Sequence, residues 1–312
     1  MQDPGRLVKH VIEEVRDFSA KQIFESGQCF RFSREPDGSY TGVVCGSFVN
    51  IAYDNEEDRL TIWSDYMPKS EGLGLKFWRD YLDLDRDYRE IKRTLSDKDP
   101  VMEKAIIAAD GLRVLNQEPW ETLISFIVSQ NSNIPKIRGS IDDICTTYGQ
   151  RLGRFENRDL YAFPTISALA GARLEDLEGC KLGYRAGYIA ETARLVDMDG
   201  GAFLATASSA SPEKAEEYLL SLSGVGPKVA HCVMVFSLRK ADVFPVDVWV
   251  ARAMNRLYGI PENDHDAMRE YAKERFSPYG GIAQMYLFEY VRKNKPDQSA
   301  IISSGPPPIS VK

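Results

Sequence analysis

The sequence predicts an α+β fold in which an antiparallel β-sheet N-terminal domain is followed by an all-helical domain. Three observations support this prediction. The 312 residues suffice for about two domains of ordinary size. Between residues 20 and 65, short β-rich runs alternate with turn signals, whereas beyond about residue 73 apolar residues recur every three or four positions. We therefore expect a β-containing domain over 1–99, a helical domain over 100–296 and a disordered tail over 297–312.

The predicted strands are short and are separated by tight turns. Residues 36–38 (Pro-Asp-Gly) and 54–55 (Asp-Asn) lie between runs rich in β-branched and aromatic residues. This pattern is typical of β-hairpins. The apolar run over 60–63 completes an antiparallel sheet within residues 20–65.

Helices are predicted wherever apolar residues recur at three- and four-residue spacing. Gly111 and Gly149 follow the ends of two such patterns, and Pro135 lies in the first turn of another, as the position preferences of glycine and proline lead us to expect. The predicted helices cover residues 75–84, 85–93, 100–112, 120–133, 134–149, 167–172, 174–178, 185–197, 212–221, 228–238, 247–258, 263–275 and 281–293.

Composition and charge exclude several classes of protein. Hydrophobic residues make up 43% and charged residues 27%, which is ordinary for a globular protein. No apolar run approaches the ~18 residues of a membrane helix, and the first residues do not resemble a secretory signal. The net charge of −7 argues against a protein that coats nucleic acid by charge alone. Residues 1–100 hold 15 Lys and Arg against 20 Asp and Glu, so a site for a polyanion is expected later in the chain.

The cysteines and histidines argue against a bound metal or a disulfide framework. No two cysteines have C-x-x-C spacing, and no two of the three histidines are four residues apart. A zinc site and an iron–sulfur cluster are therefore not expected. The odd number of cysteines fits a reducing, intracellular compartment. The five cysteines are Cys29, Cys45, Cys145, Cys180 and Cys232.

The stretch SLSGVGPKVAHC over residues 221–232 is the most informative in the sequence. Gly224 and Gly226 form a tight turn between two predicted helices, and Pro227 suits the first turn of the second. Backbone amides at such a turn form a seat for a phosphate. A plain turn between helices explains the same residues equally well.

Lys228 and Asp247 are the candidate catalytic pair. Lys228 lies at a helix start, where the helix dipole disfavours a second positive charge, and a free amine can form a Schiff base with carbon. Asp247, in the sequence PVDVW, is placed as the N-cap of a later helix. A carboxylate brought beside the amine can position it and stabilise a cationic sugar transition state. Capping alone would also account for Asp247.

The sequence LSGVGPKVAHC followed by PVDVW resembles the helix-hairpin-helix Gly/Pro-Asp superfamily of DNA glycosylases, in which a lysine after the hairpin marks the bifunctional branch. From SGQCFRF (26–32) to GGIAQMYLF (280–288) the chain resembles the 8-oxoguanine DNA glycosylase/AP lyase family, over about residues 20–292. The resemblance implies a monomeric DNA repair enzyme that needs no cofactor or membrane. It would flip 8-oxoguanine out of double-stranded DNA, excise it through a lysine Schiff base and cleave the strand by β-elimination.

The resemblance also implies roles for individual residues. Lys228 would attack C1′ of the damaged nucleotide, with Asp247 as its partner carboxylate. In the base pocket, the carbonyl of Gly27 would accept the N7 hydrogen that distinguishes 8-oxoguanine from guanine. Cys232 and Phe288 would pack on the two faces of the base, and Gln284 would bond its pairing edge. Taken singly, Cys232 and Phe288 would be assigned to the core.

Further residues are implied to contact DNA. Asn131 would fill the gap left by the flipped base, Tyr184 would wedge between base pairs and Arg185 would read the opposite cytosine. The hairpin carbonyls would hold a monovalent or calcium ion when DNA is bound. The remaining implied DNA contacts are Lys136, Gly224, Gly226 and Trp249, and the implied ion ligands are the carbonyls of Leu220, Leu222 and Val225.

Four positions depart from the pattern of the family in higher organisms. Lys136 stands where a second cytosine-reading arginine is found, and a lysine cannot present a bidentate fork. Trp249 replaces a histidine near the lesion's phosphate, His231 stands where an acidic residue is usual, and Val291 replaces an aspartate that assists base binding. These departures bear on opposite-base selectivity and on phosphate contacts.

Two other functions remain open from the sequence. One is a glycosylase for another oxidised or alkylated base. The other is a non-catalytic helix-hairpin-helix DNA-binding module, which would leave Lys228, Asp247, Gln284 and Phe288 unexplained. An endonuclease III-like enzyme is disfavoured because its C-terminal cysteine cluster is missing, and a monofunctional alkylation glycosylase is disfavoured by Lys228.

Overall fold

The computed structural model describes residues 7–66, 73–156 and 158–294. The chain forms two compact units that interleave along the sequence. The first contains Met1–Arg86 and Gly111–Arg239, and the second contains Asp87–Asp110 and Lys240–Lys312. The predicted boundary between residues 99 and 100 divides the chain into domains that follow one another in the sequence, and it stays a prediction. The tail predicted over 297–312 lies outside the described residues.

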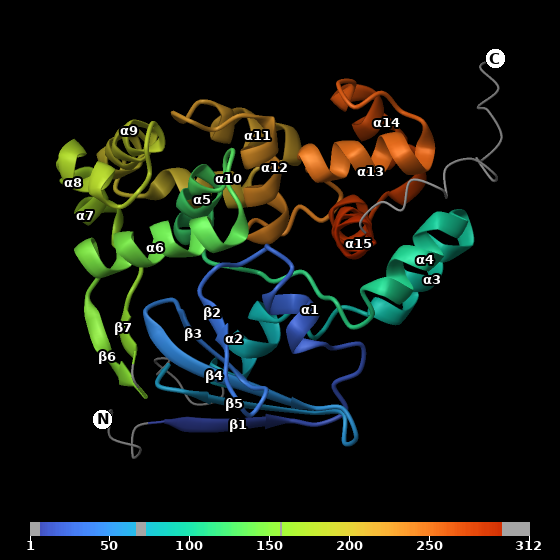
Figure 1. The fold of residues 1–312 in the computed structure, drawn as a ribbon, viewed down its shortest axis with the longest axis horizontal. Helices are drawn as coiled ribbons and strands as arrows, with labels where there is room; N and C mark the ends of the chain where they lie inside the picture. Colours follow the sequence, from blue (N-terminus) through green and yellow to red (C-terminus); the bar gives the residue numbers. More distant parts are fainter. Residues whose placement is uncertain (1–6, 67–72, 157, 295–312) are drawn as a thin grey trace. The chain divides into compact units, whose positions relative to one another are not determined.

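A five-stranded antiparallel sheet forms the N-terminal part of the first unit (Figure 1). Its strand order is β1-β5-β4-β3-β2, so the first strand pairs with the last. Alternate residues of β5 are buried, which is the signature of a sheet with one face in the core. The strands are β1 (Val8–Ile12), β2 (Phe32–Arg34), β3 (Tyr40–Val44), β4 (Ser47–Asp54) and β5 (Arg59–Ser64).

Two helices, α1 (Ala20–Phe24) and α2 (Leu73–Tyr81), contribute to the core on the buried face of the sheet. Phe24 and Trp78 are fully buried there together with aliphatic residues of β4 and β5. The prediction that strands begin at residue 20 is wrong for α1, which starts after the cap residue Ser19. The single turn was missed because its apolar pair is equally typical of a strand.

Helices make up most of the rest of the first unit. The predicted helix over 120–133 ends earlier, at Val128, because Asn131 has a positive φ of 48° that a helix cannot accommodate. The helix α10 was not predicted. The helices are α5 (Pro119–Val128), α6 (Ile134–Tyr148), α7 (Ile166–Ala170), α8 (Leu174–Gly179), α9 (Arg185–Met198), α10 (Ala202–Ser209), α11 (Pro212–Leu220) and α12 (Pro227–Phe236).

A β-hairpin interrupts the helices, so the prediction of an all-helical domain is wrong at this point. The strands β6 (Arg151–Phe155) and β7 (Arg158–Tyr161) pair with a shift of register between Arg151 and Gly153. Such a short, irregular pair lacks the apolar alternation on which the prediction depended. The ring of Phe155 contacts that of Phe48 on β4, with centroids 5.1 Å apart. The α+β class itself is confirmed.

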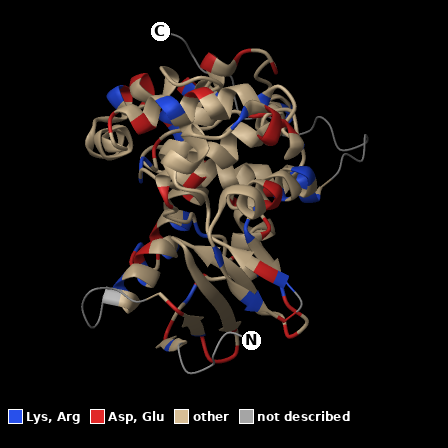
Figure 2. Cartoon of the chain, turned by 90° about the vertical axis from the view of Figure 1, so that its left-hand side faces the viewer, with Lys and Arg blue, Asp and Glu red and all other residues tan. Residues whose placement is uncertain are grey.

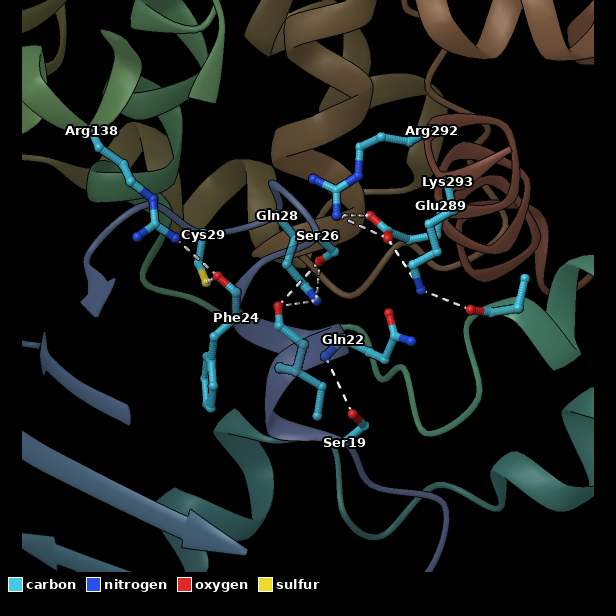
Figure 3. Close-up of polar contacts among 12 residues, drawn as sticks. Ser19, Gln22, Phe24, Ser26, Gln28, Cys29, Arg138, Glu289, Arg292 and Lys293 are labelled. Atoms are coloured by element: carbon cyan, nitrogen blue, oxygen red, sulfur yellow. Dashed lines mark hydrogen bonds and ion pairs between the residues drawn. The ribbon is translucent and has the colours of Figure 1, made fainter. Parts of the chain in front are cut away.

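The second unit consists of helices alone among its described residues. Asp99 ends α3 and caps α4 by accepting hydrogen bonds from Val101 and Met102. Within α15, the buried carboxylate of Glu289 forms an ion pair with Arg292 at 2.8 Å (Figure 3). Burial raises the pKa of Glu289, and Arg292 opposes that rise. The helices are α3 (Tyr88–Lys98), α4 (Pro100–Ala108), α13 (Val248–Tyr258), α14 (His265–Phe276) and α15 (Gly280–Lys293).

Charge is distributed along the chain rather than concentrated in one segment. Figure 2 shows Lys and Arg interspersed with Asp and Glu among the drawn helices and strands. None of the described helices is both long enough and apolar enough to cross a membrane.

Candidate active site

The hairpin predicted at Gly224 and Gly226 joins α11 to α12. Gly224 has a φ of +72°, and a Cβ placed on it would lie 2.6 Å from the Cβ and Cγ atoms of Tyr188 on α9. A side chain at this position would therefore be strained by its backbone and would also collide with a packed ring. The amide of Val225 donates to the carbonyl of Leu222 at 3.2 Å, and Gly226 is the N-cap of α12. The predicted hairpin is confirmed.

Lys228 lies in the first turn of α12, as predicted, and its amine has two contacts with α5. Its Nζ atom donates to Ser129 Oγ at 3.0 Å and lies 4.9 Å from the centre of the Phe126 ring. The hydroxyl of Ser129 in turn donates to the carbonyl of Phe126 at 2.7 Å. The half-buried amine is therefore held by a hydroxyl whose own direction is set by the end of α5.

The residues after Ser129 connect the amine to the hairpin. The side-chain amide of Gln130 donates to the carbonyl of Gly224 at 2.9 Å. Arg185 at the start of α9 donates through Nε to the carbonyl of Gln130 at 2.8 Å. Ser129 and Gln130 were not predicted as site residues, because nothing in their spacing indicates partners 55 to 99 residues away.

Three of the predicted DNA-contacting residues lie together. The side-chain amide of Asn131 donates to the hydroxyl of Tyr184 at 3.0 Å, and the guanidinium of Arg185 lies 4.7 Å from the centre of the Tyr184 ring. Tyr184 is 54% exposed, which is unusual for a tyrosine that only fills a core. Lys136 is exposed in the first turn of α6, where its backbone amide donates to the cap residue Asn133.

The predicted base-pocket residues of the first unit are Gly27 and Cys232. Gly27 lies between α1 and β2 and has a φ of +82°. Cys232 follows Lys228 by one helical turn and is buried. His231, which departs from the family pattern, is also buried, and its Nε2 atom lies 2.8 Å from Glu216. The structure therefore places His231 against α11.

The second unit carries the other predicted residues. Asp247 is the N-cap of α13, as predicted, and its Oδ1 atom accepts from the amide of Val250 at 2.8 Å. Trp249 in the first turn is 42% exposed. Gln284 and Phe288 lie one turn apart on α15, and the side-chain oxygen of the buried Gln284 has no donor among the described residues. Because Lys228 and Asp247 belong to different units, their pairing stays a prediction.

Val291 stands where the family in higher organisms has an aspartate, and its side chain is buried in α15. No group of three or more His, Cys, Asp or Glu side chains that could hold a metal ion occurs in the described part of the chain. The hairpin offers backbone carbonyl oxygens and the hydroxyls of Ser221 and Ser223.

Two family models cover most of the chain. The model of the 8-oxoguanine DNA glycosylase N-terminal domain matches residues 10–123, and that of the helix-hairpin-helix Gly/Pro-Asp superfamily of base excision DNA repair proteins matches residues 124–278. A probable N-glycosylase/DNA lyase of Methanothermobacter thermautotrophicus is 33% identical, covering 90% of this chain and 95% of the relative. The chain belongs to the 8-oxoguanine DNA glycosylase/AP lyase family.

Solved structures of the family agree with this assignment. The 8-oxoguanine glycosylase/lyase of Clostridium acetobutylicum, in complex with double-stranded DNA containing cytosine opposite 8-oxoguanine, matches with a TM-score of 0.85 and 36% identity. The match covers 92% of this chain and 98% of that one. The N-glycosylase/DNA lyase OGG1 of Arabidopsis thaliana is 29% identical, covering 92% of this chain and 80% of the relative.

The hairpin geometry predicts a difference between its two glycines. Gly224→Ala should lower the free energy of unfolding by about 3 kcal/mol, because the added methyl group combines backbone strain with a collision against Tyr188. Gly226→Ser is the matched control: a Cβ there meets nothing within 4 Å, and serine also caps helices well. Urea denaturation of both variants measures the difference. Equal stability of the two would contradict the packing described for Gly224.

Proposed function

We propose that this member of the family excises 8-oxoguanine from duplex DNA and then cleaves the strand at the abasic site. The observation that carries the proposal is the amine of Lys228, held by Ser129 at a helix start directly behind the hairpin. The names of the relatives, N-glycosylase/DNA lyase and 8-oxoguanine glycosylase/lyase, support the same pair of activities. The proposed partner is double-stranded DNA inside the cell, and the proposed active form is a monomer.

The chemistry assigns Lys228 as the nucleophile. Its amine forms a bond to C1′ of the damaged nucleotide while the bond from C1′ to the base breaks, and the base leaves with that electron pair and takes up a proton. Opening of the sugar gives a Schiff base between Lys228 and C1′. Loss of a proton from C2′ then expels the 3′ phosphate, and water hydrolyses the Schiff base to free Lys228.

Lys228→Gln tests this assignment. The amide is similar in size but cannot form an imine, so base release and β-elimination should both be abolished. Single-turnover excision and electrophoretic binding to lesion DNA are measured on the same preparation, and binding should remain largely intact. If the variant released the base at more than a trace of the wild-type rate, Lys228 would not be the nucleophile.

Asp247 is proposed to stabilise the positive charge that develops on the sugar and to position the amine. Asp247→Asn should slow base release by roughly 10²-fold, the scale of losing one electrostatic stabiliser. Its capping of α13 should survive, because asparagine also accepts the hydrogen bond from Val250. A melting temperature near that of the wild type is the control. An unchanged rate in the folded variant would reduce Asp247 to a helix cap.

The base pocket is proposed to use the residues that the family resemblance implies. The Gly27 carbonyl accepts the N7 hydrogen of 8-oxoguanine, and Cys232 and Phe288 pack on the faces of the base. Gln284 bonds the pairing edge. Its buried side-chain oxygen has no donor among the described residues, which supports that role, since burying such an oxygen without a donor costs about 1–3 kcal/mol.

Recognition of the opposite base is proposed to involve Asn131, Tyr184, Arg185 and Lys136. Arg185 donates to the carbonyls of residues 130, 131 and 182, so a cytosine would be read by the remaining N–H of its guanidinium or by exchange of one of these acceptors. Trp249 and the hairpin residues Gly224 and Gly226 are proposed to contact the DNA backbone, where amides at a helix start suit a phosphate.

Because position 136 is a lysine, we expect the enzyme to accept bases other than cytosine opposite 8-oxoguanine more readily than a relative with an arginine there. A lysine offers one donor direction and loses more side-chain entropy than the fork of an arginine. Lys136→Arg should therefore widen the margin of cytosine over thymine, guanine and adenine by up to roughly tenfold, for about 1.4 kcal/mol. Single-turnover excision of 8-oxoguanine opposite all four bases measures this margin. Equal discrimination by the two proteins would show that position 136 does not read the widowed base.

The hairpin is proposed to hold a cation when DNA is bound. No donor contacts the carbonyls of Leu220 and Val225 among the described residues, whereas that of Leu222 accepts from the Val225 amide. Three carbonyl oxygens at one helix end suit a hard cation such as calcium or a monovalent ion, which would neutralise nearby phosphate charge. A well-resolved crystal structure of the DNA complex should show ion density there. Water or empty density between the three oxygens would contradict the proposal. Catalysis is proposed to need no other cofactor.

A further inference from the structure

The side chains of Ser26, Gln28 and Cys29 hydrogen-bond the segment that contains them to the carbonyls of α1 (Figure 3). This segment connects α1 to β2 without regular secondary structure. Its glycine, Gly27, adopts a positive φ of 82°, and a Cβ there would lie 3.2 Å from Ile134 Cδ1. The direction of the Gly27 carbonyl therefore depends on what fixes the residues on either side.

Three carbonyls near Gly27 are occupied by hydrogen-bond donors. The carbonyl of Phe24 accepts from Arg138 at 3.1 Å, and that of Ile23 accepts from the hydroxyl of Ser26 at 3.1 Å. The carbonyl of Gln28 accepts from Gln117 Nε2 at 2.7 Å. By contrast, no donor within the described residues contacts the carbonyls of Ser26, Gly27 and Cys29. Ser26 and Cys29 are buried, whereas Gly27 is half-buried, so Gly27 is the one of the three residues that a ligand can reach most easily.

The side chain of Gln28 is the centre of the network. It is 1% exposed, and its Nε2 atom donates to the carbonyls of Arg113 at 2.9 Å and of Ile23 at 3.1 Å. Its Oε1 atom accepts from the amide of Leu115 at 2.8 Å. The amide side chain thus binds α1 on one side and residues 113–115 on the other, so the residue immediately after Gly27 cannot rotate without breaking buried hydrogen bonds.

We infer that Gln28 is the positioning residue that aims the Gly27 carbonyl at N7 of the flipped base and thereby sets the discrimination between 8-oxoguanine and guanine. This inference rests on the proposed function. 8-Oxoguanine carries a hydrogen on N7, whereas N7 of guanine is an acceptor. A fixed carbonyl therefore accepts a hydrogen bond from 8-oxoguanine and repels N7 of guanine. A carbonyl that is free to turn away does neither.

The expected size of the effect follows from a single hydrogen bond. A net hydrogen bond contributes about 1 kcal/mol, and repulsion of the wrong base adds to the difference. Loss of a fixed carbonyl should therefore reduce selective excision of 8-oxoguanine by roughly tenfold. Cleavage at a preformed abasic site involves no base, so the same loss should leave that reaction much less affected.

The test uses Gln28→Met in the full chain, which keeps the length of the side chain and removes every hydrogen bond it makes. Two single-turnover rates are measured: release of 8-oxoguanine opposite cytosine, and strand cleavage at a preformed abasic site. Asn50→Leu is the matched control, because it removes an amide that bonds Ser39 and Thr41 within the sheet. We expect the ratio of the two rates to fall about tenfold for Gln28→Met and to stay at the wild-type value for Asn50→Leu.

A second variant covers the case in which Gln28→Met fails to fold. Gln117→Met removes only the donor to the Gln28 carbonyl, and it should lower the same ratio about threefold. A wild-type ratio in a folded Gln28→Met protein, or in Gln117→Met if the first variant is unfolded, would overturn the inference while the proposed function stands. Failure of the wild-type protein to release 8-oxoguanine, with cleavage at the abasic site retained, would overturn both.

Discussion

The hydrogen bond between Lys228 Nζ and Ser129 Oγ, 3.0 Å long, is the contact on which the candidate active site depends. It joins the start of α12 to the end of α5, so the position of the amine is set by the packing of two helices. Ser129 is also the C-cap of α5. In the chain that follows, Gln130 bonds the hairpin and Asn131 bonds Tyr184. One short segment thus orients the amine, the hairpin and the exposed tyrosine together.

The second constraint is the buried amide network around Gln28. Buried polar groups stabilise a unique conformation only when their partners are present, and Gln28 uses both of its amide atoms. The network fixes a backbone carbonyl rather than a side chain. It therefore suits recognition of a small chemical difference, a hydrogen on one ring nitrogen. An acidic protein can select a lesion in this way without depending on a strongly basic surface.

The features that the sequence predicted correctly are those with local causes. The hairpin follows from two glycines and a proline, the cap at Asp247 from its place before an amphipathic helix, and the turns of the sheet from the Pro-Asp-Gly and Asp-Asn signals. The strand β1 was missed because it pairs with β5, about fifty residues away. Ser129, Gln130 and Gln28 were missed as site-forming residues for the same reason: each is an ordinary polar residue whose partners are determined by tertiary structure.

The central claim is that Lys228 carries the covalent intermediate. The most direct measurement is to reduce the reaction with 8-oxoguanine DNA by borohydride, digest the trapped complex and locate the modified residue by mass spectrometry. If Lys228 is the nucleophile, we expect a single adduct, on the nitrogen of Lys228 at the start of α12. An adduct on another lysine or on the N-terminal amine would contradict this claim, because the amine held by Ser129 would then not be the one that attacks C1′.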